Sequence, residues 1–90
     1  MALGIAVLYN TDFEHIAGAA SVDAVAVRSA AEAVRDALIA AGHRAELVGM
    51  WGKDVPEVMA RLDRERPDLV FNLCESLGGI ARNEIAVPAL

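Results

Sequence analysis

Short apolar runs, separated by stretches with helical spacing, constrain the fold of this chain more than any other feature. The first run, LGIAVLY at residues 3–9, holds no charged side chain, so a strand formed there would be apolar on both faces. A second strand is predicted around residues 45–48 and a third over residues 68–73. Strands that are apolar on both faces are typical of parallel sheets covered by helices on both sides. The sequence therefore predicts an α/β fold.

The segments between these strands carry the spacing of amphipathic helices. Residues 22–41 predict the first helix, with Ser21 as its N-cap and Gly42 just beyond its end. Residues 55–62 predict a shorter helix that is capped by Asp54. The apolar residues of the first helix recur at intervals of three and four: Val27, Ala30, Ala31, Val34, Leu38 and Ala41.

The predicted elements alternate in the order β-α-β-α-β, and a third helix is predicted over residues 83–90. This alternation implies a parallel sheet with helices on both faces, and right-handed crossovers place the first strand in the centre, in the order 2-1-3. We therefore predict a three-layer α/β domain over residues 1–90. Ligands bind beyond the carboxyl ends of such strands. The predicted site is formed by the loops at residues 10–21 and 74–82, while residues 49–53 are predicted as a turn.

Composition excludes several classes of partner. The chain has 13 acidic and 8 basic residues, a net charge of −5, and no cluster of lysine or arginine. This pattern argues against binding to nucleic acid or to an anionic membrane surface. No apolar stretch is long enough for a membrane span, and the N-terminus does not have the pattern of a signal peptide. With one cysteine the chain cannot form an internal disulfide, so we expect a cytoplasmic protein.

Several residues in the two predicted site loops have both a structural and a functional interpretation. Cys74 follows a buried strand, where a lone cysteine is usually a small apolar filler. Glu14 and His15 form either a solvated pair or part of a site, and no metal site is expected. Trp51, in the turn GMWGK, is either a lid over the core or a contact to a neighbouring subunit. No GxxxxGK[ST] or GxGxxG phosphate motif is present.

The chain resembles the N-terminal domain of the D-alanine–D-alanine ligase group within the ATP-grasp superfamily. The most specific part is an apolar strand ending in NLCE, followed by a glycine pair and then NE-x-x-VPAL. The resemblance covers almost the whole chain, through the segments GIAVLYN, SAAEAVRDALIAAGHRAELV, RLDRERPDLVFNLCESLGG and RNEIAVPAL.

This resemblance implies a biotin-carboxylase N-terminal-like fold, the pre-ATP-grasp domain that precedes the ATP-grasp core. Ligases of this kind use ATP and Mg²⁺ to activate a carboxylate as an acyl phosphate and join it to an amine, in peptidoglycan synthesis among other processes. ATP and Mg²⁺ are held by the central and C-terminal domains. The resemblance therefore implies a truncated substrate-side domain that binds no cofactor or metal, has no catalytic residue of its own and is inactive alone.

The resemblance also implies the residues that line the substrate site. Glu14 is similar to the glutamate that meets the amino group of the first amino acid in these ligases, a sound pairing of a carboxylate with an ammonium. Where the ligases carry a His–Gly pair, this chain has Glu75 and Ser76. With Gly78 and Gly79, they form a loop that is expected to be one wall of the site, with Glu75 close to Glu14.

The sequence also leaves two other functions to consider. The alternative is a stand-alone flavodoxin-like module for binding or assembly, without catalysis. A receiver-like signalling domain is disfavoured, because it needs a phosphorylatable aspartate where the third strand ends in Asn72, Leu73 and Cys74. The expected partners are an amino acid or another small carboxylate or amine substrate and a second copy of the chain. We expect a homodimer or higher oligomer, with the contact near residues 68–90, because the outer edge of the third strand would be unpaired.

Overall fold

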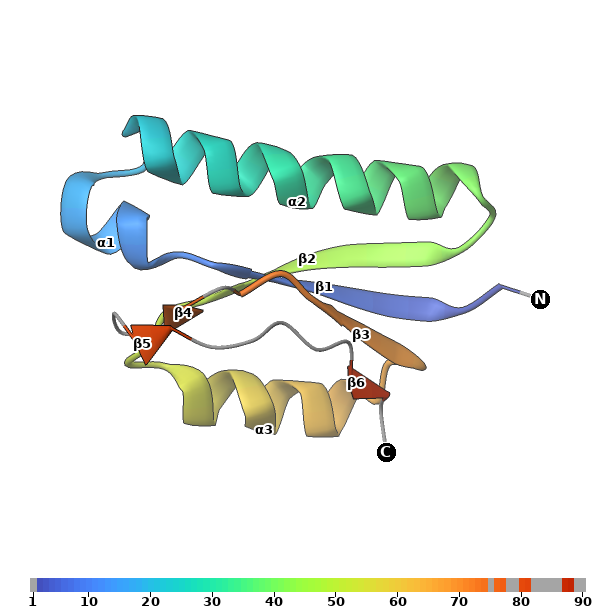
Figure 1. Cartoon of the computed structure of the whole chain (residues 1–90). Coiled ribbons are helices and arrows are strands. Elements are labelled where there is room, and N and C mark those ends of the chain that lie inside the picture. The colour runs from blue at the N-terminus through green and yellow to red at the C-terminus, as the bar shows by residue number, and fades with distance from the viewer. Residues whose placement is uncertain (1, 75, 78–79, 82–86, 89–90) are drawn as a thin grey trace.

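The computed structural model describes residues 2–74, 76–77, 80–81 and 87–88. It is a small α/β domain in which three parallel strands lie in the order β2-β1-β3, between the helix α2 on one face and α3 on the other (Figure 1). The predicted order 2-1-3 and three-layer arrangement are thus confirmed. The elements are β1 (Gly4–Asn10), α1 (Asp12–Ala17), α2 (Val22–Ala40), β2 (Arg44–Met50), α3 (Val55–Glu65), β3 (Leu69–Asn72), β4 (Ser76–Leu77), β5 (Ile80–Ala81) and β6 (Val87–Pro88).

The central strand β1 supplies residues to both halves of the core. Alternate side chains of a strand point to opposite faces of the sheet, so Val7 packs with Ala31 of α2, whereas Leu8 packs with Val58 of α3. All four residues are buried. The continuous apolar run at the start of the chain is therefore explained by helices on both faces of the sheet.

Helix α2 begins and ends where its sequence predicts. The Ser21 hydroxyl accepts a hydrogen bond from the backbone N–H of Ala24 at 3.2 Å, which is the expected N-cap contact. Gly42 has a φ of +94°, a left-handed conformation that glycine adopts without strain. Among helices in the described ranges, none combines the length and the apolar character that a membrane span requires.

Three sequence predictions of secondary structure are wrong in part. Residues 10–21 contain the short helix α1 rather than loop alone, and β2 continues through Gly49 and Met50, which were predicted as a turn. Val87 and Pro88 form strand β6 instead of helix. The rest of the third helix predicted from Asn83 lies outside the described residues.

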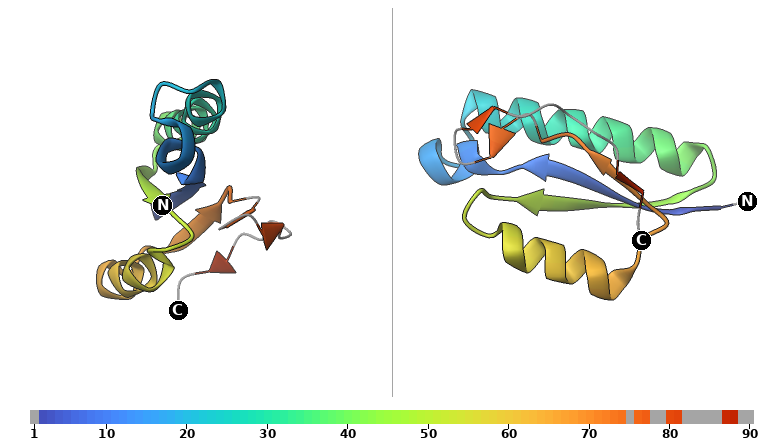
Figure 2. Two further views of the ribbon diagram at one scale, coloured as in Figure 1. Left: turned by 90° about the vertical axis from the view of Figure 1, so that its left-hand side faces the viewer. Right: turned by 60° about the horizontal axis from the view of Figure 1, so that its bottom comes forward.

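Strand β6 also changes the expectation for the outer edge of β3. It pairs antiparallel with β3, with Leu69 opposite Pro88 and Val70 opposite Val87. The edge that the sequence predicted to be unpaired is therefore covered at these two positions. Figure 2 shows β6 beside β3 on the side of the sheet away from β2.

Candidate functional site at the carboxyl edge of the sheet

Two neighbouring strands end at asparagines that turn the chain in the same way. The Asn10 side-chain oxygen accepts a hydrogen bond from the backbone N–H of Asp12 at 2.6 Å. The Asn72 side-chain oxygen accepts one from the N–H of Cys74 at 2.9 Å. An asparagine that binds the N–H two residues ahead replaces the strand pairing with a local turn. Both loops therefore start at the same edge of the sheet, as the strand order predicts.

The loop after β1 is also fixed to the loop after β2. The backbone N–H of Thr11 donates to the carbonyl of Met50 at 2.9 Å, and the N–H of Gly52 donates to the Asp12 carboxylate at 3.0 Å. Asn10, Thr11 and Asp12 are each 7–8% exposed. A buried carboxylate is tolerated here because it accepts a hydrogen bond from the backbone N–H of Gly52. We call these three residues the buried polar turn.

The last residues of β2 and the start of the loop after β1 pack so closely that one glycine has no room for a side chain. A Cβ atom on Gly49 would lie 2.8 Å from Cγ2 of Thr11 and 3.2 Å from the hydroxyl oxygen of Tyr9. Thr11 is buried in the polar turn and has little freedom to move. Only glycine at position 49 therefore allows Thr11 and Tyr9 to pack in this way.

An aromatic stack lies on the same edge. The rings of His15 on α1 and Trp51 after β2 are parallel to within 9°, with centroids 3.9 Å apart, and Lys53 Nζ lies 5.3 Å from the indole centroid. The backbone N–H of Trp51 donates to the Asp54 carboxylate at 2.7 Å. The sequence left the role of Trp51 open. The predicted parallel order of the strands could have indicated this stack. The loops after β1 and β2 must begin at the same edge of a parallel sheet, so His15 and Trp51 were candidates for a contact.

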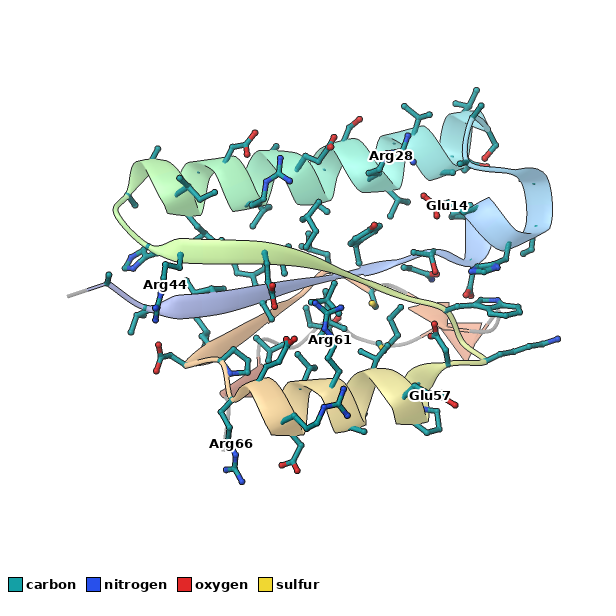
Figure 3. All side chains as sticks on the ribbon, turned by 180° about the vertical axis from the view of Figure 1, so that it is seen from behind. Glu14, Arg28, Arg44, Glu57, Arg61 and Arg66 are labelled. Atoms are coloured by element: carbon teal, nitrogen blue, oxygen red, sulfur yellow. The ribbon has the colours of Figure 1, made fainter. Side chains whose placement is uncertain are left out.

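Glu14, the residue expected to meet a substrate ammonium, is in an ion pair. Its carboxylate accepts a hydrogen bond from Arg28 on α2 at 2.9 Å, and the two side chains are 27% and 33% exposed. Figure 3 shows them reaching toward each other from α1 and α2. Burial raises the pKa of Tyr9, and the charge of Glu14 raises it further. An ammonium ligand at Glu14 would therefore have to share this carboxylate with Arg28.

The other predicted wall of the site is described only in part. Cys74 is 4% exposed and belongs to the core on the α3 side, which agrees with its interpretation as an apolar filler. The backbone of Ser76 lies in β4 and pairs with Ala81. Glu75, Gly78 and Gly79 lie outside the described residues, and so does the predicted proximity of Glu75 to Glu14.

A hollow of about 540 Å³ lies at the opposite, amino end of the sheet. It is far from the buried polar turn, and sequence reasoning did not anticipate it. Its charged lining residues belong to the start of β2, the end of α3 and the segment that leads into β3: Arg44, Glu46, Glu65, Arg66 and Asp68.

Two of the acidic residues that line this hollow, Glu46 and Glu65, are paired with the same arginine. Arg61 lies 3.6 Å from the Glu46 carboxylate and 3.1 Å from that of Glu65, and Figure 3 shows its side chain between α3 and β2. Partial burial and the hydrogen bond with Glu65 raise the pKa of Glu46, while Arg61 lowers the pKa of Glu65. Exposed pairs of this kind contribute little to binding or stability. The carboxyl edge is therefore the stronger candidate for a site.

Metal chemistry and relatives give no further guidance. In the part of the chain that the structure describes, no three His, Cys, Asp or Glu residues gather closely enough to hold a metal ion. Comparisons with protein-family models, with curated proteins and with solved structures find no match to this chain.

Proposed function

We propose that this chain is the substrate-side, pre-ATP-grasp domain of an ATP-dependent carboxylate–amine ligase of the D-alanine–D-alanine ligase type, and that it is inactive alone. The segments NLCESLGG and NEIAVPAL support the assignment through their resemblance to that group. The structural observation that most supports this assignment is the position of Glu14. The buried polar turn holds the start of α1 at the carboxyl edge, the edge at which β3 also ends.

In this proposal Glu14 binds the ammonium of the first substrate. A carboxylate accepts strong, charge-assisted hydrogen bonds from an ammonium group, and it has room for more than one donor. Arg28 donates one hydrogen bond to Glu14 and orients the carboxylate when the substrate is absent. ATP and Mg²⁺ belong to the other domains of the ligase, so no catalytic step is assigned to this chain.

Amino-acid binding tests this proposal directly. The chain labelled with ¹⁵N is titrated with a panel of D- and L-amino acids, and amide shifts are followed by NMR. Because one domain supplies only one wall of the site, we expect a Kd on the order of 1 mM or weaker. Shifts should centre on residues 10–15 and 73–74 and disappear in Glu14→Gln. Glu57→Gln, an exposed glutamate on α3, is the matched control. Shifts that survive Glu14→Gln would contradict the proposal.

ATP turnover provides a second test. The pure 90-residue chain, with Mg²⁺ and the same amino acids, should release no ADP, because it contains no nucleotide-phosphate motif. Magnesium-dependent ADP release would refute the assignment of ATP chemistry to other domains. Reading the gene beyond codon 90 for a glycine-rich ATP-grasp region tests the ligase assignment itself.

One observation favours the alternative, a stand-alone module for binding or assembly. The Glu14 carboxylate already has a cationic partner in Arg28, so the carboxyl edge is stable without any ligand. A titration in which no amino acid shifts residues 10–15, together with a reading frame that lacks an ATP-grasp region, would favour this module over the ligase domain.

A further inference from the structure

The hollow at the amino end of the sheet, which we call the amino-end hollow, is a gap in the interface between β1 and α3. Residues two positions apart on a strand share a face of the sheet. Along the face of β1 that α3 covers, Leu8 and Ala6 belong to the buried core, and Gly4 follows at the amino end. Ala6 and Gly4 line the hollow. The side chains of β1 thus become smaller toward this end and do not fill the space beneath α3.

The other walls of the amino-end hollow are charged at positions where apolar side chains would fill the interface. On β2, Glu46 shares a face with Val48, a buried core residue. On α3, Glu65 follows Val58 and Leu62 at helical spacing, where an apolar residue would continue the packed face. The volume of about 540 Å³ lies within the range of about 300–1,000 Å³ that is usual for small-molecule sites. The hollow is therefore large enough for a small ligand and suits a charged one.

Two opposite charges lie over Gly4 without pairing with each other. A Cβ atom on Gly4 would lie 3.4 Å from Nη2 of Arg44 and 3.5 Å from Oδ2 of Asp68, so these two atoms are no further apart than the sum of those distances. Within the described ranges Arg44 has no ion pair. Figure 3 shows its side chain at the amino ends of β1 and β2. One small molecule could therefore contact both charges at once.

We propose that the amino-end hollow binds a free α-amino acid, with the ligand carboxylate on Arg44 and the ligand ammonium on Asp68. A guanidinium matches a carboxylate through two parallel hydrogen bonds, and a carboxylate accepts charge-assisted hydrogen bonds from an ammonium. In an α-amino acid the ammonium nitrogen and the carboxylate carbon are about 2.5 Å apart, so both groups fit between charges at this spacing. The site lies at the opposite end of the sheet from Glu14, and it does not depend on the proposed ligase function.

Ligands that carry a single kind of charge fit the amino-end hollow less well. A simple anion on Arg44 would also lie close to the carboxylates of Asp68 and Glu46, and a simple cation on Asp68 would lie close to the Arg44 guanidinium. Like charges in close proximity disfavour binding. A ligand that has both charges on neighbouring atoms places each of them beside its opposite.

The acidic wall of the hollow should select the side chain of the ligand. Glu46 and Glu65 share one guanidinium, that of Arg61, so the carboxylates on this wall outnumber their cationic partner. Arg66, the other basic residue of the lining besides Arg44, lies 3.9 Å from Asp63, and Figure 3 shows it pointing away from the sheet. We therefore expect free lysine to bind more tightly than free alanine, and free glutamate to bind more weakly.

Binding at this site should be weak and sensitive to salt. Arg44 and Asp68 are both exposed, and solvent screens the interactions of exposed charges. We expect a Kd for free lysine on the order of 1–10 mM at low ionic strength. The Kd should rise with added salt, because the screening length falls from about 10 Å at 0.1 M to about 3 Å at 1 M.

NMR titration of the ¹⁵N-labelled 90-residue chain, at constant ionic strength, tests the site without any substitution. Free lysine, up to about 50 mM, should shift the amides of residues 4–6, 44–46 and 68, which line the hollow. Acetate and methylamine carry one charge each and should bind at least about tenfold more weakly. Absence of these shifts with lysine, or binding of acetate as tight as that of lysine, would overturn the proposal.

Variants that remove one charge locate the contacts of the ligand. Arg44→Gln and Asp68→Asn should each raise the Kd for free lysine at least about fivefold, and asparagine keeps an oxygen for the hydrogen bond with the Gly4 N–H. Arg35→Gln and Asp36→Asn make the same changes in an ion pair on α2, on the other side of the sheet, and should leave the Kd unchanged. Equal effects of the two sets of variants would contradict the site.

Glu14→Gln separates this site from the proposed substrate site. It should abolish amino-acid shifts at residues 10–15 and leave those at residues 4–6 and 44–46 unchanged, whereas Arg44→Gln should do the reverse. Shifts at the amino end that persist at full strength in Arg44→Gln would overturn the proposal for the amino-end hollow, and the proposed function of the carboxyl edge would be unaffected.

Discussion

Asp12 and Asp68 play the same structural role at opposite ends of the sheet, yet in very different surroundings. At the carboxyl end, Asp12 is 7% exposed and accepts a hydrogen bond from the N–H of Gly52 at 3.0 Å. At the amino end, Asp68 is exposed and accepts one from Gly4 at 2.7 Å. Burial makes a lost hydrogen bond costly because water cannot replace it. The longer bond should therefore contribute more to stability.

The first prediction compares the stability that is lost when each of these two aspartates is replaced by alanine. Asp12→Ala should lower the free energy of unfolding by about 2–3 kcal/mol, since it removes a buried carboxylate and leaves the half-buried Gly52 N–H without this partner. Asp68→Ala should cost about 1 kcal/mol or less, because water reaches the Gly4 N–H. Urea unfolding followed by circular dichroism measures both. Equal losses, or a larger loss in Asp68→Ala, would show that burial does not decide how much each hydrogen bond contributes.

The second prediction compares close packing at the two ends. Gly49→Ala should cost about 2 kcal/mol, because the new methyl would lie 2.8 Å from Cγ2 of Thr11 and tightly packed sites do not relax easily. At Gly4 the nearest atom to a new Cβ is Nη2 of Arg44 at 3.4 Å, the end of a flexible side chain. Gly4→Ala should therefore change stability by less than about 0.5 kcal/mol. Thermal unfolding of both variants is the measurement, and a tolerated Gly49→Ala would contradict the described packing.

The third prediction concerns the aromatic stack at the carboxyl end. His15→Ala should cost about 1 kcal/mol, the usual worth of an aromatic pair beyond its burial. Trp51 is the only tryptophan of the chain, so its emission should shift to longer wavelength as the indole becomes more exposed. Lys53→Ala, which removes the cation near the same ring, should cost about 0.5 kcal/mol at most. Identical emission spectra of His15→Ala and the unmodified chain would argue against the stack.

The smallest expected effect lies at the amino end, in the pH dependence of Glu46. Its pKa is raised from 4.5 by burial and by Glu65, so the folded state holds this proton more tightly than the unfolded state. Its contribution to stability is therefore present below pH 4.5 and is lost as pH rises through the raised pKa. The lowered pKa of Glu65 acts in the opposite direction, with a contribution lost on acidification.

Glu46→Gln should remove this loss, so the variant gains stability relative to the unmodified chain between about pH 4 and pH 7. The gain should stay below about 0.5 kcal/mol, because the Glu46 side chain is 55% exposed and solvent screens its charge. Glu57→Gln serves as a control with the same change in net charge. A larger gain, or a gain on acidification, would mean that the amino end is less open to water than described.

Some elements followed from the sequence because their signals are local. Helix α2 has an N-cap in Ser21, a periodic apolar face and a glycine beyond its end, and all three lie within one segment of chain. Helix α1 gave no such signal: it has six residues, and no side chain caps its start. It forms where Asp12 meets Gly52, a contact across forty positions that no window of sequence contains. Strand β6 was missed for the same reason, because its pairing partner β3 lies far along the chain.

By itself, the sequence determined the alternation of strands and helices and the 2-1-3 order of the parallel strands, and it predicts a site at their carboxyl edge. Apolar periodicity and the handedness of crossovers are enough for these features. Only the tertiary structure decided the contacts on that edge: the Glu14–Arg28 ion pair, the His15–Trp51 stack and the place of Gly49. Each depends on where two distant segments meet, and the close packing of the whole domain fixes that distance to within an ångström or so.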